Sequence, residues 1–224
     1  AVGVEEYRDQ GYLVESVFNA LLRLGWSHGD DEIISREQAV EWFDLPDVNK
    51  GASRLDMDKM LALNAHYLKE KPAADLLALA RPFIEAEGWT DIDDEGLARL
   101  VLGMPAVADR AKTLADIGGM AKYYLQEPPI DIEDKARKAL GEDGLAVVAD
   151  MVGVLGAVDD WSEAGIKAAL SGYAETKALK VGKVFQPLRA ALTGAMASPG
   201  VTEVAFAFGK EKTLRHLQAV LAAS

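Results

Sequence analysis

Apolar residues along this chain recur at intervals of three and four, the spacing that places them on one face of an α-helix. The series Leu13, Val17, Leu21 and Leu24 follows this spacing, and Gly25 comes directly after it, a residue typical of a helix end. Because the same periodicity dominates the rest of the sequence, we expect an all-α protein, mostly or wholly helical.

Several helix boundaries are marked by capping residues and prolines. Ser35 followed by Gln38 matches a capping box, and Pro46 is expected to end the helix that starts there. Asp56 is expected to cap a helix over residues 57–68. The same reasoning predicts further helices over residues 74–87, 131–140, 145–155, 162–178 and 184–192, and a last one from residue 212 onward.

Two proline-containing breaks indicate how the chain is divided. One lies at Lys71-Pro72 and the other at Glu127-Pro128-Pro129. Proline interrupts a helical pattern because it lacks the backbone N–H and clashes with the preceding turn. We therefore expect three segments, over residues 1–72, 73–127 and 128–224.

The composition narrows the class of protein. The chain has 224 residues, of which 50% are hydrophobic, enough for one large domain or two to three small ones. It contains no cysteine, which excludes disulfides, zinc ribbons and a thiolate nucleophile. The amino end lacks the pattern of a signal peptide, and no apolar run approaches the roughly 20 residues that cross a bilayer. We expect a cytoplasmic protein with no membrane partner.

Charge is distributed unevenly along the chain. The formal net charge is −12, which alone argues against nucleic-acid binding, since basic residues supply most of the non-specific affinity for phosphates. Residues 161–224 nevertheless contain eight basic and four acidic residues, a net of +4, which leaves −16 for the first 160 residues. This asymmetry suggests that the carboxyl end faces an anion while the rest keeps the molecule soluble.

One acidic stretch has the beginning of a calcium-binding loop. Residues 91–96 place carboxylates at the first, third and fifth positions and glycine at the sixth. Loops of this type need a bidentate Glu at the twelfth position, where this chain has Leu102. We therefore favour a helix start, with Thr90 and Asp93 as a capping box.

Other candidate sites have simpler explanations. His28 precedes three carboxylates at residues 30–32, but the turn composition there favours a solvated loop over a metal site. Gly153 and Gly156 lack the preceding strand and the spacing of a dinucleotide-binding loop, and no Walker-type motif occurs. No pattern singles out a pair of catalytic carboxylates. We therefore predict no catalytic, metal-binding or cofactor-binding residue in this chain.

The basic carboxyl region, residues 180–201, allows two interpretations. It has the features of a helix start, with Pro187 in the first turn, followed by a loop that contains Gly194, Pro199 and Gly200. Alternatively, a loop that presents backbone groups and small side chains beside Arg189 is suited to an unstacked RNA base. The residues alone leave these interpretations even.

Several blocks of sequence carry a resemblance to a known family. They lie at residues 11–30, 42–45, 48–50, 54–56, 63–64, 110–114, 186–194, 199–200 and 209–211. Together these blocks resemble bacterial glutamyl-tRNA synthetases, and the first resembles the segment just downstream of the catalytic K-x-S-K loop. That loop and the H-x-G-H motif, which bind ATP in the family, are absent from this sequence. The resemblance implies the carboxyl half of such an enzyme, with a stem-contact region over 1–72 followed by two helical-bundle anticodon-binding domains over 73–127 and 128–224.

Carried over to this sequence, the resemblance implies an anticodon site. Arg110 would read the third anticodon base, which is cytosine in glutamate tRNA and guanine in glutamine tRNA. Arg189 and Val201 would contact the first base, and Ser198 and Pro199 would hold the middle uracil. Serine at 198 and valine at 201 replace a familiar threonine and leucine, and each keeps the hydroxyl or the apolar character.

These observations predict a chain that binds tRNA(Glu) as a monomer, without DNA, and that does not charge the tRNA by itself. No cofactor is expected for this chain, whereas ATP and magnesium are expected in the parent ligase. The alternative is an acidic helical protein-interaction module without RNA binding, which would not be sensitive to a single anticodon base. The sequence leaves open whether tRNA(Gln) is also recognised, and whether the chain is a fragment or a natural short protein.

Overall fold

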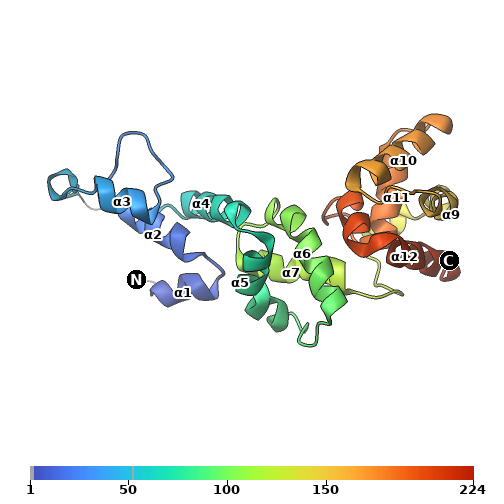
Figure 1. Cartoon of the computed structure of the whole chain (residues 1–224), viewed down its shortest axis with the longest axis horizontal. Helices are drawn as coiled ribbons and strands as arrows, with labels where there is room; N and C mark the ends of the chain where they lie inside the picture. The colour runs from blue at the N-terminus through green and yellow to red at the C-terminus, as the bar shows by residue number, and fades with distance from the viewer. Residues whose placement is uncertain (1–2, 52) are drawn as a thin grey trace. The chain divides into compact units, whose positions relative to one another are not determined.

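The computed structural model describes residues 3–51 and 53–224, and every regular element within them is helical, with no strand (Figure 1). This confirms the all-α prediction. The α-helices are α1 (Val4–Asp9), α2 (Val14–Gly25), α3 (Arg36–Trp42), α4 (Met57–Glu70), α5 (Ala73–Ala86), α6 (Asp94–Ala108), α7 (Leu114–Leu125), α8 (Asp134–Ala139), α9 (Glu142–Gly156), α10 (Glu163–Thr176), α11 (Gly182–Thr193) and α12 (Val201–Ala222).

The capping residues recognised in the sequence mark most of the corresponding helix starts correctly. Ser35 and Gln38 form the expected capping box at the start of α3. The Asp56 carboxylate accepts hydrogen bonds from the backbone N–H groups of Asp58 and Lys59 at the start of α4. At α6 the prediction is wrong in one residue, because the Asp93 carboxylate, and not Thr90, caps the helix by accepting from the Gly96 N–H at 2.7 Å.

Two helix limits differ from the prediction. Helix α3 ends at Trp42, earlier than expected, and Pro46 lies in a separate 3₁₀ turn over Leu45–Asp47. The last helix begins at Val201, eleven residues before the predicted start at 212. A single residue, Gly209, interrupts it with φ of 75°, so the apolar pattern of its two parts does not follow one continuous periodicity.

The chain divides into two compact units. Unit 1 comprises Ala1–Thr90 and Val107–Gly119, and unit 2 comprises Asp91–Ala106 and Met120–Ser224. These limits do not coincide with the three segments expected from the proline-containing breaks, so the domain boundaries near residues 72 and 127 stay predictions.

The core of unit 1 forms where α2 packs against α4 and α3. One cluster of buried residues comprises Tyr12, Val17, Ala20 and Met60. A second cluster comprises Trp26, Ile34 and Ala39. Apolar residues of α2 therefore serve both clusters, but Leu21 of the predicted series is 44% exposed.

A single buried amide joins three segments of unit 1. Asn64 of α4 is fully buried, and its side-chain oxygen accepts from the Leu13 N–H at 2.8 Å and from the Ser16 hydroxyl. Its amide nitrogen donates to the carbonyls of Lys112, at 2.6 Å, and Gly11, at 3.4 Å. The Asn64 amide thus has partners for both lone pairs and both N–H groups, so it ties the approach to α2 and the approach to α7 to one helix.

Close packing of the backbone at Gly11 supports this junction. The Gly11 carbonyl also accepts from the Leu114 N–H at 2.8 Å. Gly11 has φ of 86°, and an added Cβ would lie 2.7 Å from the Ala115 nitrogen. Glycine is required here because any side chain would both strain the backbone and force α7 away.

Unit 2 is built around a bundle in which α9, α10, α11 and α12 pack on one another, with α8 against α11. Its centre contains many fully buried apolar residues. They include Met151 and Leu155 of α9, Ile166 of α10, Leu188 of α11 and Val204 of α12.

Charged groups meet at the edge of this bundle. The Lys212 side chain of α12 is 3% exposed and forms an ion pair with Glu127. Arg99 and Arg215 lie 3.7 and 3.5 Å from the same carboxylate. Burial opposes the charged form of Glu127, but the hydrogen bond from Lys212 and the three nearby cations outweigh it and lower the pKa of this carboxyl.

His216, one turn after Lys212, is fully buried beside Phe208, with ring centroids 4.7 Å apart. Neither ring nitrogen has a partner in hydrogen-bonding geometry within the described residues. Burial, and then the Lys212 ammonium, lower the pKa of His216 to about 4, although Glu127 acts in the opposite direction. The fold therefore holds this imidazole in its neutral form.

We predict that Asn64→Ala destabilises unit 1 by about 2–4 kcal/mol, because it leaves several buried N–H and carbonyl groups without partners. Asn64→Asp keeps the shape but loses both donors, so it is expected to be destabilising as well. Urea unfolding followed by tryptophan fluorescence measures the effect in a Trp161→Phe background, where the remaining tryptophans all belong to unit 1. Asn49→Ala, at an exposed position, is the control and is expected to change stability by less than about 0.5 kcal/mol.

We predict that His216→Met reduces the loss of stability in acid. The folded pKa lies below the ordinary value of 6.5, so the contribution of His216 is fully present above pH 6.5 and is lost as pH falls toward 4. Urea unfolding at pH 7 and 4.5, followed by circular dichroism, measures the difference between variant and parent. Glu127 is common to both proteins and its titration cancels, so parallel stability curves would contradict the assignment.

Candidate nucleic-acid interface

The predicted site residue Arg110 lies in the short turn between α6 and α7, in unit 1. Its side chain is exposed, and its backbone N–H donates to the Val107 carbonyl at 3.0 Å. The neighbouring Ala111 and Leu114 are 2% and 6% exposed. The turn is therefore anchored by buried residues next to an exposed arginine.

The start of α7 fixes the turn further. The Asp116 carboxylate accepts from the N–H groups of Lys112 and Thr113, at 2.9 and 3.0 Å, and the Asp116 N–H donates to the Thr113 hydroxyl at 3.2 Å. The Lys112 carbonyl accepts from the Asn64 amide. The backbone from 110 to 114 is thus defined by hydrogen bonds on both sides, which limits how far Arg110 can move.

The other predicted site residues belong to unit 2, around the loop that joins α11 to α12. Gly194 ends α11 with φ of 71°, and an added Cβ would lie 2.0 Å from the Asp131 carbonyl oxygen. The Gly194 carbonyl accepts from the Glu133 N–H at 2.8 Å. The loop therefore leaves the helix in a direction that only glycine allows.

Hydroxyl groups organise the inside of this loop. The Thr193 hydroxyl lies 2.7 Å from the Arg189 carbonyl, to which it donates, and accepts from the Ala195 N–H at 3.2 Å. The Ser198 hydroxyl lies 3.2 Å from the same Thr193 oxygen. Hydrogen bonds between near neighbours thus replace the secondary structure that the loop lacks.

The structure brings Arg189, Ser198, Pro199 and Val201 together at this loop, but it buries most of their side chains. Ser198 is 8% exposed and Val201 2% exposed, and Pro199 is also buried. Arg189 is half-buried and donates from Nη1 to the Met196 carbonyl at 3.3 Å. Sequence reasoning places Arg189 on a helix beside the loop that contains Ser198 and Pro199, but it gives no sign that Ser198, Pro199 and Val201 face inward.

The sequence analysis missed the residues that support the loop from outside. The Tyr123 hydroxyl donates to the Ala197 carbonyl at 3.1 Å, and the Gln126 amide donates to the Thr193 carbonyl at 3.1 Å. Both donors lie about 70 residues before the loop in sequence. Only the tertiary fold relates them to it, and no local pattern distinguishes them.

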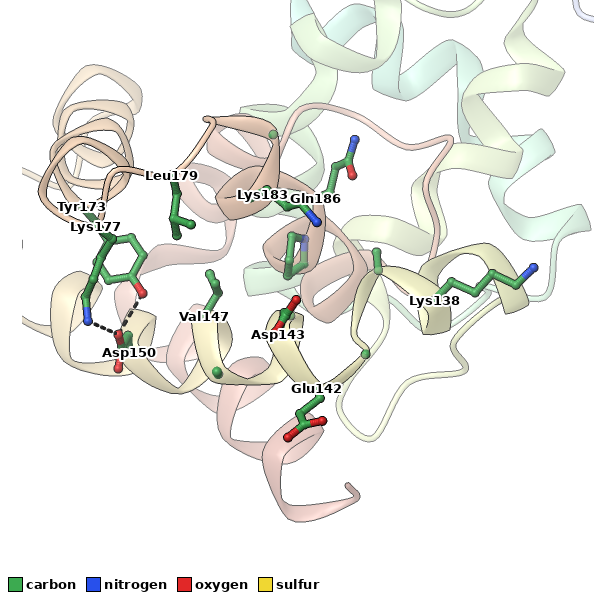
Figure 2. Close-up of a pocket in the computed structure, with 16 residues that line it drawn as sticks. Lys138, Glu142, Asp143, Val147, Asp150, Tyr173, Lys177, Leu179, Lys183 and Gln186 are labelled. Atoms are coloured by element: carbon green, nitrogen blue, oxygen red, sulfur yellow. Dashed lines mark hydrogen bonds and ion pairs between the residues drawn. The ribbon is translucent and has the colours of Figure 1, made fainter.

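A cleft of unit 2, of about 790 Å³, lies elsewhere, between α9, α10 and the start of α11. Figure 2 shows Asp150 of α9 accepting from the Tyr173 hydroxyl, at 2.8 Å, and paired with Lys177, at 3.1 Å. Burial and then the Asp150 carboxylate raise the pKa of Tyr173 to about 12. Charges of both signs line this cleft, and none of the predicted site residues does.

The described residues contain neither a cluster that could hold a metal ion nor a helix that could span a membrane. Across residues 3–51 and 53–224, no three His, Cys, Asp or Glu side chains gather where they could hold a metal ion. The Trp42 ring stacks on the His28 imidazole, 4.4 Å between centroids. In the same part of the chain, no helix is both long and apolar enough to span a membrane.

Comparison with known proteins gives consistent matches. Residues 75–221 match the family described as an anticodon binding domain. Glutamate–tRNA ligase 2 of Brucella ovis is 44% identical over 222 residues, which cover 97% of this chain and 47% of that protein. Glutamate–tRNA ligase 1 of Brucella melitensis is 43% identical with the same coverage. The chain thus spans about half the length of the curated relatives it matches.

Solved structures agree with these matches. A glutamate tRNA ligase from Elizabethkingia meningosepticum, crystallised in complex with its amino acid, superposes with a TM-score of 0.81 at 28% identity, covering 96% of this chain and 42% of that one. Glutamate–tRNA synthetase from Elizabethkingia anophelis gives a TM-score of 0.76, with the same identity and coverage. The chain therefore belongs to the glutamate–tRNA ligase family, corresponds to its carboxyl-terminal region and contains its anticodon binding domain.

Proposed function

We propose that this chain recognises tRNA(Glu) through its anticodon, as the RNA-reading part of an ATP-dependent glutamate–tRNA ligase. The observation that carries the proposal is the match of residues 75–221 to an anticodon binding domain, because this range contains both the Arg110 turn and the loop that joins α11 to α12. The sequence has neither the H-x-G-H nor the K-x-S-K motif, so we assign to these residues tRNA binding without activation of glutamate.

In this proposal Arg110 reads the third anticodon base. Its exposed position on an anchored turn supports this role. A guanidinium carries five N–H donors and can pair with the acceptor groups of cytosine. Guanine presents a donor edge and more bulk at the same place, so glutamine tRNA would be disfavoured.

The loop that joins α11 to α12 reads the other two bases. Because Ser198, Pro199 and Val201 are buried, we propose that their side chains determine the shape of the loop. Main-chain groups near Ser198 and Pro199 then contact the middle uracil. Arg189 keeps donors beyond the one directed at the Met196 carbonyl, and these suit the first base. This arrangement would read bases splayed out of the anticodon stack.

Charge favours the same end of the molecule. The net of +4 over residues 161–224 provides the attraction for phosphates that the protein as a whole, at −12, lacks. Because that attraction comes from a limited number of cations, we expect binding to weaken as salt rises. The proposal describes a cytoplasmic protein that binds its tRNA as a monomer.

The proposal predicts that changing the third anticodon base of tRNA(Glu) from cytosine to guanine weakens binding about tenfold or more, equivalent to about 1.4 kcal/mol. Arg110→Gln is expected to remove this preference, because the donors that distinguish the bases are lost. Fluorescence anisotropy with labelled tRNA at low and moderate salt measures the dissociation constants.

Arg36→Gln is the matched control, since Arg36 is an exposed arginine of unit 1 whose side chain makes no hydrogen bond or ion pair with another described residue. It is expected to leave the preference for cytosine intact. Equal binding of both RNAs by the parent chain, or binding of neither, would refute anticodon reading and would favour a protein-interaction module.

A further inference from the structure

The loop between α11 and α12 is held by donors outside it. Residues 194–200 contain no helix or strand, and a loop of this kind has mobile carbonyl groups unless other groups bind them. Three carbonyls at its start and middle, those of Thr193, Gly194 and Ala197, accept hydrogen bonds from the single segment 123–133. Segment 123–133 therefore supports the loop through these hydrogen bonds.

The donors are themselves fixed. Tyr123 is 6% exposed, and burial raises the pKa of its hydroxyl, which therefore remains a neutral donor at physiological pH. Gln126 is bound on three sides. Its side chain donates to the loop, its N–H donates to the Lys122 carbonyl at 3.0 Å, and its carbonyl accepts from the Lys212 ammonium at 3.0 Å.

The hold on Gln126 is strengthened by the adjacent ion pair. Lys212 is almost completely buried and binds both the Gln126 carbonyl and the Glu127 carboxylate. Arg99 donates to the Tyr124 carbonyl at 3.1 Å and lies beside the same carboxylate. Residues 123–127 thus form a stretch of backbone that hydrogen bonds from Lys212 and Arg99 hold in place. From this stretch, the Tyr123 and Gln126 side chains donate to the loop.

A loop fixed in this way needs little ordering when RNA binds. Each side chain or backbone segment that must be immobilised on binding lowers affinity, so a loop already set by the protein keeps more of its contact energy. Carbonyls that accept from Tyr123 and Gln126 are also directed toward the protein. The hydrogen-bonding groups of the loop that remain available to a base are therefore set before the RNA binds.

We infer that Tyr123 and Gln126 are positioning residues for anticodon recognition, which hold the loop of residues 194–200 in the conformation that reads the first and middle bases. The inference rests on the proposed function. It assigns specificity to side chains that contact the loop and not the RNA. Arg110, in the other unit, reads the third base independently of them.

Tyr123→Phe is the direct test, since it removes one hydroxyl and keeps the ring. Dissociation constants are measured for tRNA(Glu) and for versions with the middle uracil changed to cytosine or the third cytosine changed to guanine. We expect Tyr123→Phe to reduce discrimination at the middle base at least threefold and to leave discrimination at the third base unchanged. Gln126→Met, which removes the amide donor at similar volume, is expected to act in the same direction.

Tyr173→Phe is the matched control. It also removes one tyrosine hydroxyl in unit 2, together with the hydrogen bond to Asp150 that Figure 2 shows. Neither Tyr173 nor Asp150 belongs to the loop or to the segment that supports it. Tyr173→Phe is expected to leave discrimination at both bases unchanged. Amide hydrogen exchange over residues 195–200 gives a second measurement without RNA, and faster exchange is expected in Tyr123→Phe but not in Tyr173→Phe.

The outcomes separate the inference from the proposed function. A parent chain that does not distinguish the RNAs refutes the proposed function, and the inference with it. A parent chain that discriminates, with Tyr123→Phe and Gln126→Met that discriminate equally well and exchange at the parent's rate, refutes the inference alone. Equal loss of discrimination at the middle and third bases would indicate general destabilisation and would also refute a specific positioning role.

Discussion

Carbonyl groups in the connections between helices have no helical partner, and in both units a side-chain amide supplies one. Asn64 donates to the Lys112 carbonyl beside the Arg110 turn, at 2.6 Å. Gln126 donates to the Thr193 carbonyl at the start of the other loop, at 3.1 Å. An unpaired buried carbonyl is costly, so each amide fixes the course of the chain where no regular structure can. The two proposed recognition elements thus depend on the same kind of interaction.

Much of the fold is accessible from local sequence. Ser35 and Asp56 mark helix starts through hydrogen bonds with residues two or three positions away, so pattern reasoning finds them. It fails at the first part of α12, residues 201–211, because Gly209 interrupts the helix and breaks its periodicity before the predicted start at 212. Thr90 and Asp93 lie within one helical turn of each other in sequence, and helix propensity does not show which of them caps α6.

The candidate site divides in the same way. The glycine and proline residues near Ser198 suffice to place it in a loop, whereas the sequence analysis does not predict the turn that holds Arg110. The inward orientation of Val201 depends on how α12 packs in unit 2, and the contacts of Tyr123 and Gln126 span 74 and 67 residues. Such long-range pairs leave no local signature, because each partner alone is an ordinary polar residue on or near a helix.

The break in α12 at Gly209 has a consequence for how the helix is used. The Ala205 carbonyl, four residues before the break, accepts from the Trp161 indole N–H at 3.1 Å and lies 3.3 Å from the Thr213 hydroxyl after the break. An added Cβ at Gly209 would meet nothing within 4 Å, so only backbone conformation demands glycine there. The residues before the break follow directly on the loop of residues 194–200, and Lys212 after the break donates to the Gln126 carbonyl. Through one glycine, a single helix therefore serves both the loop proposed to read the anticodon and the segment that supports this loop.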